Sequence, residues 1–153
     1  MRARIVASVS LAAAVMLTAS GCGFIAPQAT TEHYDASDGT SATVGSVKVL
    51  NAILLSEDGE TGNLIASVAN TGNDRVTVTL QYEGDGQKVD KKVSVAGNTV
   101  KSIGTDEQFL LTGIGAELGS LFPVFVQYDD ETGKQMLVPV LDGTLPEYAE
   151  YLP

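Results

Sequence analysis

Residues 75–82, RVTVTLQY, decide the fold class of this chain. Valine, leucine and tyrosine occupy every second position, and polar side chains fill the positions between them. A period of two with one apolar face is the pattern of a β-strand that is buried on one side. Residues 89–95 repeat the alternation after a Gly-Asp-Gly turn. The sequence therefore predicts short strands separated by turns.

Further apolar stretches, bounded by turn residues, extend in both directions from this one. Their regular spacing and the near absence of a helical period predict one all-β sandwich domain over residues 45–153. A chain of this length can bury a core of its own. The predicted strands are 46–55, 64–69, 75–82, 89–95, 99–103, 108–114, 122–128 and 135–141.

The end of the chain carries two local signals. Pro139 has no N–H to donate, so its strand is predicted to be an edge strand or to contain a bulge. Leu145, Tyr148 and Leu152 have helical spacing, which predicts one or two helical turns within residues 145–153. This tail is expected either to cover the core as a plug or to bind a partner as a peptide.

The first 22 residues have the layout of an export signal. Arg2 and Arg4 precede an uncharged apolar run, and small residues follow it directly before Cys22, the only cysteine. This layout resembles the lipobox of bacterial lipoproteins. The resemblance implies that residues 1–21 are a removed signal peptide and that Cys22 is the lipid attachment site, carrying acyl chains such as palmitate. The domain would then be held at the extracytoplasmic face of the cell membrane.

Two alternatives to lipidation stay open: a plain secretory signal with a chance cysteine, and a short anchor that is never cleaved. As a helix the apolar run is roughly 20 Å long, which is too short for a hydrocarbon core of about 30 Å. Residues 28–43 are polar and lack an apolar period, so residues 22–44 are expected to be a lipidated Cys22 followed by a flexible tether. His33, the only histidine, lies in that tether and is expected to be solvated.

The chain that follows the signal is strongly acidic. Without residues 1–21 it has seven basic and 19 acidic residues, a formal charge of −12. Such a surface repels nucleic acid, so nucleic acid is not an expected partner. Solubility and cation attraction are two interpretations of the charge. The acidic loops lack EF-hand spacing and are typical of turns: Glu57, Asp58 and Glu60; Glu83 and Asp85; Asp129, Asp130 and Glu131.

Four short pieces, in this order, resemble the periplasmic copper chaperone PCu(A)C family. They are residues 67–72 (SVANTG), 95–100 (VAGNTV), 110–114 (LLTGI) and 138–140 (VPV). The resemblance covers residues 47–140 and extends to copper-chaperone-related lipoproteins of high-GC Gram-positive bacteria. It implies an immunoglobulin-like or cupredoxin-like sandwich of about seven to nine strands.

The family's copper site, built from two histidines and two methionines, is not retained. The resemblance places the first histidine at Gln81 and a His-x-Met pair at Gln108 and Leu110, while residues 87–95 contain no methionine. Met136 is the only methionine after Cys22. Because Cu(I) prefers thioether and imidazole donors, we predict that the fold is kept and that copper binding is lost.

The sequence contains no pattern that supports a hydrolase or a phosphate-binding site. A Ser-His-Asp triad would have to recruit His33 from a flexible segment, and no phosphate-binding glycine motif opens a helix. We assign no catalytic, cofactor-binding or metal-binding residue. We expect a non-enzymatic, lipid-anchored envelope module that binds or scaffolds an unidentified envelope protein. The alternative is a copper-handling protein with an altered site, and an enzyme ranks third.

Overall fold

The computed structural model describes residues 2–19, 34, 35 and 37–153, and the chain divides into two units between Tyr34 and Asp35. The predicted lipid attachment site Cys22, the cleavage position before it and His33 lie outside the described residues. The signal peptide and lipid anchor therefore stay predictions.

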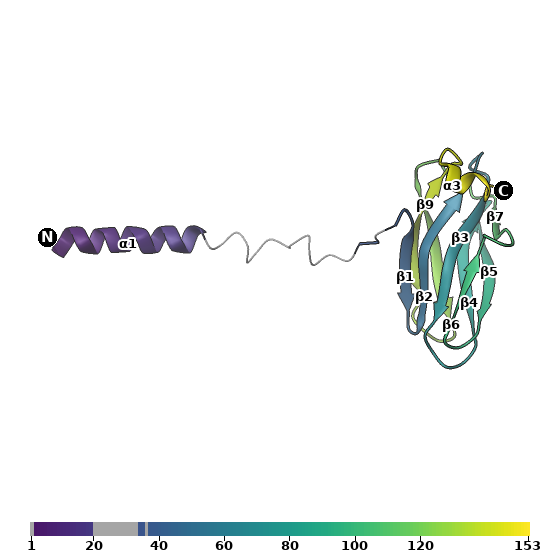
Figure 1. Ribbon diagram of the computed structural model, residues 1–153, viewed down its shortest axis with the longest axis horizontal. Helices are drawn as coiled ribbons and strands as arrows, with labels where there is room; N and C mark the ends of the chain where they lie inside the picture. Colours follow the sequence, from purple (N-terminus) through teal and green to yellow (C-terminus); the bar gives the residue numbers. More distant parts are fainter. Residues whose placement is uncertain (1, 20–33, 36) are drawn as a thin grey trace. The chain divides into compact units, whose positions relative to one another are not determined.

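The first unit contains helix α1 (Arg2–Ala19), the coiled ribbon next to the N-terminus in Figure 1. The hydroxyl groups of Ser8 and Ser10 each donate to the backbone carbonyl four residues earlier, at 2.9 and 3.0 Å. The helix therefore satisfies these polar groups internally. Of the helices described, none combines the length and the hydropathy needed to cross a membrane.

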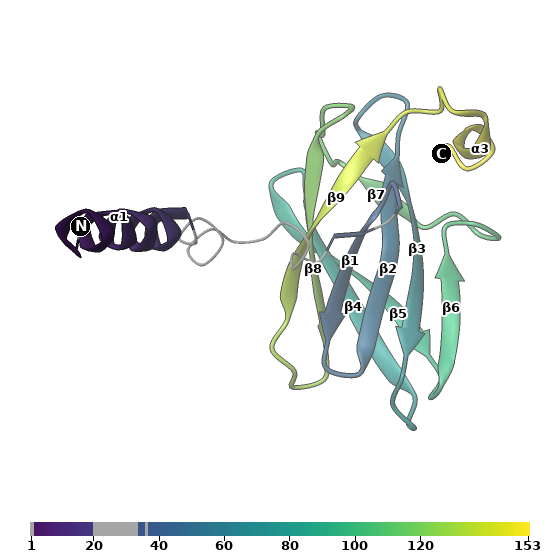
Figure 2. The ribbon, with the colours of Figure 1, turned by 60° about the vertical axis from the view of Figure 1, so that its left-hand side comes forward.

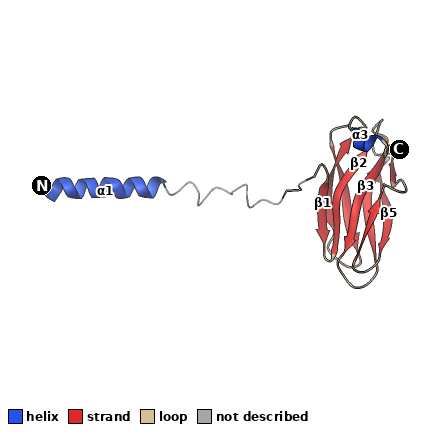
Figure 3. Cartoon of the chain, in the orientation of Figure 1, coloured by secondary structure: helices blue, strands red, loops and turns tan. Residues whose placement is uncertain are grey.

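The second unit is a β-sandwich, whose strands are drawn in red in Figure 3. It confirms the predicted all-β fold and the upper end of the predicted strand number. Each predicted strand is present, with ends shifted by a few residues. The strands are β1 (Thr40–Val44), β2 (Val47–Leu55), β3 (Thr61–Asn70), β4 (Val76–Gly84), β5 (Gln87–Val95), β6 (Thr99–Ile103), β7 (Leu110–Thr112), β8 (Leu121–Tyr128) and β9 (Lys134–Leu141).

The strands form two layers that share β9. One layer contains β1, β2, β3, β6 and β7, and the other runs in the order β5-β4-β8-β9. All pairs are antiparallel except the short pairing of β9 with β2. β9 pairs with β8 over six positions and then with β2 at Val140 and Leu141, so it links the two layers (Figure 2). β5 and β6 are left as the two outer strands of the path.

The prediction of an edge strand or bulge at Pro139 is wrong, because β9 lies between β8 and β2 and keeps a regular register with β8. The N–H of Val140 donates to Ser120 at 2.9 Å, on the β8 side. Successive N–H groups alternate in direction, so the N–H missing at Pro139 would point away from β8. The pairing with β2 begins only at Val140, and proline therefore removes no ladder bond.

The predicted domain boundary at residue 45 is also wrong. Strand β1 pairs antiparallel with β2 and buries Ala42 and Val44, so these residues belong to the sandwich and not to a tether. Ahead of the strand, the carboxylate of Asp35 accepts the backbone N–H of Ser41 at 2.9 Å. The domain thus begins near Asp35. The small side chains of TSATV hide the alternation that would have predicted this strand.

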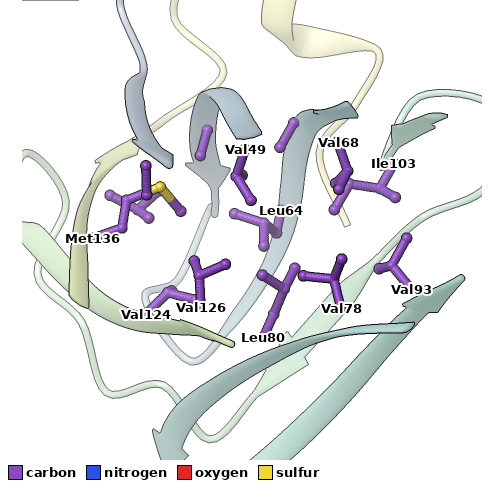
Figure 4. Close-up of a cluster of buried hydrophobic side chains, with 14 of the residues drawn as sticks. Val49, Leu64, Val68, Val78, Leu80, Val93, Ile103, Val124, Val126 and Met136 are labelled. Atoms are coloured by element: carbon purple, nitrogen blue, oxygen red, sulfur yellow. The ribbon is translucent and has the colours of Figure 1, made fainter. Parts of the chain in front are cut away.

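The core lies between the inner faces of the two layers (Figure 4). Val78 and Leu80, from the stretch that predicted the fold, are fully buried there. Leu64 from β3 and Val126 from β8 meet them in the same cluster and are also fully buried. Each such side chain contributes roughly 2 kcal/mol of hydrophobic stabilisation. The alternation read from residues 75–82 is therefore confirmed as a core-facing strand.

The C-terminal tail folds back onto the domain. It forms the short helix α3 (Pro146–Ala149), as predicted, but none of the helix residues is buried. The hydroxyl group of Tyr148 donates to Asp38 Oδ2 at 2.6 Å, and this hydrogen bond is the main cause that raises the pKa of Tyr148 to about 12. Asn63 and Gln108 donate to the carbonyls of Tyr151 and Leu152, each at 2.8 Å. The tail is docked through polar contacts rather than as an apolar plug.

Candidate functional site

The first position at which the family resemblance places a copper ligand is on the outer face of β4. Gln81 follows the buried Leu80, so its side chain points to the opposite side of the sheet. Its Nε2 donates to Asp90 Oδ1 on β5 at 2.8 Å. Gln81 and Asp90 are directly opposite each other in the ladder, so the amide is used in a cross-strand pair.

The other ligand positions lie near a hollow of about 370 Å³ between β5 and the segment from β6 to β7. Lys92 from β5 and Gln108 both line it, together with Lys101 from β6. The structure thus brings together two of the segments that would supply ligands. Gln81 is not among the described residues that line this hollow, and Leu110 is half-buried in β7 outside it.

The donor set of this hollow does not fit Cu(I). It presents the ammonium groups of Lys92 and Lys101 and the carboxylates of Asp106 and Glu107, which are hard groups. Met136 is buried in the core and cannot supply a thioether here without unfolding. Within residues 2–19, 34, 35 and 37–153, no three His, Cys, Asp or Glu side chains are grouped so that they could hold a metal ion.

The acidic loops have the turn geometry that the sequence predicted. Asp58 Oδ1 accepts the backbone N–H groups of Thr61 at 3.0 Å and Glu60 at 2.8 Å, and these hydrogen bonds lower the pKa of Asp58. Asp85 and Asp129 have positive φ angles of 51° and 45°. Aspartate tolerates this conformation better than most residues. These acids therefore shape turns.

A second hollow, of about 460 Å³, lies where the turns before β2, before β4 and after β8 meet. Asp129, Asp130 and Glu131 line it and are exposed. The hydroxyl of Tyr128 also lines it and accepts the backbone N–H of Ser46 at 2.9 Å. Throughout the described part of the chain, every buried side-chain nitrogen or oxygen has a hydrogen-bond partner. The three carboxylates are therefore in contact with water.

The sequence-based reasoning missed two buried asparagines that organise the loops. Asn63 is fully buried in β3, and Asn70 is 2% exposed at the end of the same strand. Asn70 Nδ2 donates to Asp74 at 2.7 Å, and its Oδ1 accepts the N–H of Gly72 at 2.9 Å. The available signal was an asparagine directly at each end of the apolar run 64–69. A buried amide needs partners from neighbouring segments.

Comparisons with known proteins agree with this architecture. The copper-bound PCuAC domain from PmoF2 matches with a TM-score of 0.52 and 13% identity, over 67% of this chain and 97% of that domain. The sandwich resembles a PCuAC domain in fold. The apo PCuAC domain of PmoF2 matches with a TM-score of 0.52 and 12% identity, over 69% and 97% of the two chains. The apo PCuAC domain from PmoF1 gives 0.50 and 12%, over 65% and 97%.

The likeness to PCuAC domains is one of fold. The three domains share few residues with this chain, so ligand identity does not transfer with the backbone. No family model matches the sequence, and no curated protein matches it. The family resemblance inferred from residues 67–72, 95–100, 110–114 and 138–140 is confirmed at the level of structure.

Proposed function

We propose that this chain is a lipid-anchored, non-enzymatic binding module with a PCuAC-like sandwich, held at the extracytoplasmic face of the cell membrane. One observation carries the proposal. The fold is kept, while the ligand positions hold Gln81, Gln108 and Leu110, two of which spend their amides on Asp90 and on the carbonyl of Leu152. A lipid on Cys22 would raise the local concentration of the domain near membrane partners.

The anchor is tested by replacing Cys22 with alanine. Two or three acyl chains hold a protein to a bilayer far more firmly than one, whereas the variant has no attachment atom. We expect the wild-type chain in the membrane fraction and the Cys22→Ala chain in the soluble fraction, both folded by circular dichroism. A variant that stays firmly in the membrane would mean that the hydrophobic run is the anchor.

The same pair of chains tests the binding role. In-cell crosslinking of the wild-type lipoprotein should give one reproducible adduct with an envelope protein, and Cys22→Ala should reduce that adduct because the local concentration falls. Metal analysis of the purified lipoprotein should find no stoichiometric copper. Absence of any adduct from the wild-type chain would contradict the proposed binding role.

A second candidate is copper handling through an altered site. The fold likeness favours it, since a copper-bound PCuAC domain is among the solved structures that this chain resembles. The donor set near Lys92, Lys101 and Gln108 opposes it on chemical grounds. Any copper site would need donors from elsewhere, such as His33, which lies outside the described residues.

The two candidates are separated by titrating the purified Cys22→Ala chain with Cu(I) against a chromophoric chelator. This variant also removes the free thiol, which would bind Cu(I) on its own. We expect no transfer of copper from the chelator to the protein. Stoichiometric uptake would overturn the first proposal, and its loss in a variant that also carries His33→Ala would place the altered site in the tether.

A further inference from the structure

Positive charge gathers on one open side of an acidic sandwich. Seven basic residues follow Cys22, against 19 acidic ones, and five of the seven lie on or beside the outer strands β5 and β6. Lys92 and Lys101 line the same hollow from the two strands, together with Asp106 and Glu107 from the segment that follows β6. Arg75 reaches β5, with Nη1 at 3.5 Å from Ser94 Oγ. The five residues are Arg75, Lys88, Lys91, Lys92 and Lys101.

Two of these lysines point inward at the free edges. Lys91 lies opposite the fully buried Leu80, and Lys101 lies opposite the fully buried Val68, so both side chains are on the core side of their sheets. An inward-facing lysine on an edge strand prevents that edge from pairing with another copy of itself. Edge-to-edge pairing between two copies of this chain is therefore disfavoured.

Among the described strands, β5 pairs only with β4, and near Lys92 and Val93 its outer side faces residues 101–109 across the hollow of about 370 Å³. All nine residues of the strand pair with β4 in a continuous register without a bulge. In the described part of the chain, no backbone hydrogen bond joins residues 87–94 to any segment other than β4. A row of free N–H and C=O groups of this length is a template for one further strand.

We propose that the free edge of β5 binds an extended acidic segment of a partner envelope protein as an added strand. This inference rests on the proposed binding function and names its surface and its partner chemistry. Lys88 and Lys92 are exposed, and on β4 Lys88 faces Glu83 while Lys92 faces Thr79. Acidic side chains opposite them would form favourable cross-strand pairs, whereas a second β5 would set lysine against lysine.

The edge also dictates the pattern of the bound segment. Lys88, Asp90 and Lys92 share the outer face of β5, and Val89, Lys91 and Val93 share the inner face. A matching strand places acidic residues opposite Lys88 and Lys92 but not opposite Asp90, and apolar residues opposite Val89 and Val93, with one acid opposite Lys91. Charge complementarity supplies specificity, and main-chain hydrogen bonds supply the affinity.

The test uses the ¹⁵N-labelled Cys22→Ala chain and a nine-residue peptide of Glu and Val, the length of β5, with Glu placed opposite Lys88, Lys91 and Lys92. A Lys-Val peptide of the same length is the control probe. We expect amide shift changes concentrated in residues 87–95, and slower hydrogen exchange at the outward N–H groups of that strand. The Lys-Val peptide should leave these amides unchanged. Equal binding of both peptides, or shift changes centred elsewhere, would overturn the proposal.

Matched variants separate the edge from bulk charge. Lys88→Glu with Lys92→Glu should weaken binding of the acidic peptide about tenfold, because two attractive pairs become repulsive. Lys48→Glu with Lys134→Glu changes the net charge equally at exposed positions on β2 and β9, and should stay within about twofold of the parent chain. Equal losses in both variants would overturn the β5 assignment, as would self-association of the chain in place of peptide binding. A crosslinked partner that binds at another surface would overturn the assignment to β5 but would still support the proposed binding function.

Discussion

Replacing Asn63 with alanine is expected to lower the free energy of unfolding by about 3 kcal/mol. The side chain is fully buried, and its Nδ2 donates to the carbonyls of Gly104 and Tyr151, each at 2.8 Å. Its Oδ1 accepts the N–H of Phe109 at 2.8 Å. Alanine would leave three main-chain groups without these partners, one at a buried and two at part-buried hydrogen bonds, where the loss is more costly than at the surface.

Urea unfolding followed by circular dichroism measures this loss. Asn73→Ala is the matched control, because Asn73 is exposed and, among the described residues, its side chain bonds only to Asn98, whose Nδ2 donates at 3.0 Å. The control should cost less than about 0.5 kcal/mol. Asn63→Ala should also speed proteolysis of the tail after residue 143, since the carbonyl of Tyr151 is no longer held. Similar stabilities of the two variants would mean that Asn63 does not join the tail to β3.

Replacing Leu64 with alanine is expected to destabilise the domain by about 3 kcal/mol through a cavity between the two layers. Leu64 is fully buried in β3 and lies near Leu80 and Val126, which come from the opposite layer (Figure 4). Because hydrogen bonds within each sheet hold the strands in place, the core can collapse only partly around the missing side chain, and a cavity remains.

The comparison variant is Leu137→Ala, which removes the same atoms from the outer face of β9, where the side chain is 47% exposed. It should cost less than about 1 kcal/mol, since little apolar surface leaves water there on folding. Both variants should keep the slope of the urea transition if unfolding stays two-state. Equal losses at the two positions would mean that the interface between the layers is not the main source of stability.

The strands that the sequence predicted well are those with large apolar side chains at every second position. Residues 75–82 are the clearest example, because valine, leucine and tyrosine alternate with threonine and glutamine. Strand β1 could not be found in this way, since Ala42 and Val44 are its only buried residues and alanine gives a weak signal. Its place depends on pairing with β2, a tertiary contact that local composition does not encode.

Pro139 shows a second limit of local rules. Proline in a strand predicts an edge strand or a bulge, yet Pro139 lies in a strand that has partners on both sides. Proline disturbs a sheet only where its missing N–H would have donated to a neighbouring strand. The direction of that N–H depends on the register of the strand. Register in turn depends on where the parallel pairing with β2 begins, at Leu54 and Val140. That information is absent from residues 134–141 taken alone.

The loss of soft copper donors at Gln81, Gln108 and Leu110 was visible from residue types alone. The distribution of charge was only partly visible. Lys91 interrupts the apolar series of Val89, Val93 and Val95, and this was a signal of an inward-facing lysine. The sequence could not predict that Lys92 and Lys101 line one hollow, because β5 and β6 belong to different layers.

The contacts that hold the C-terminal tail to the sandwich bear on the order in which the chain can fold. The hydrogen bond between Tyr148 and Asp38 joins residues 110 positions apart, and that between Asn63 and Tyr151 joins residues 88 apart. Hairpins such as β4–β5 are local and can form early, but closing such long loops carries an entropic cost that only late contacts repay. If the chain emerges from an export channel with its N-terminus first, the sandwich cannot close until β8, β9 and the tail have followed. Until then, either the lysines on the edge strands or a chaperone must keep the early strands from pairing incorrectly.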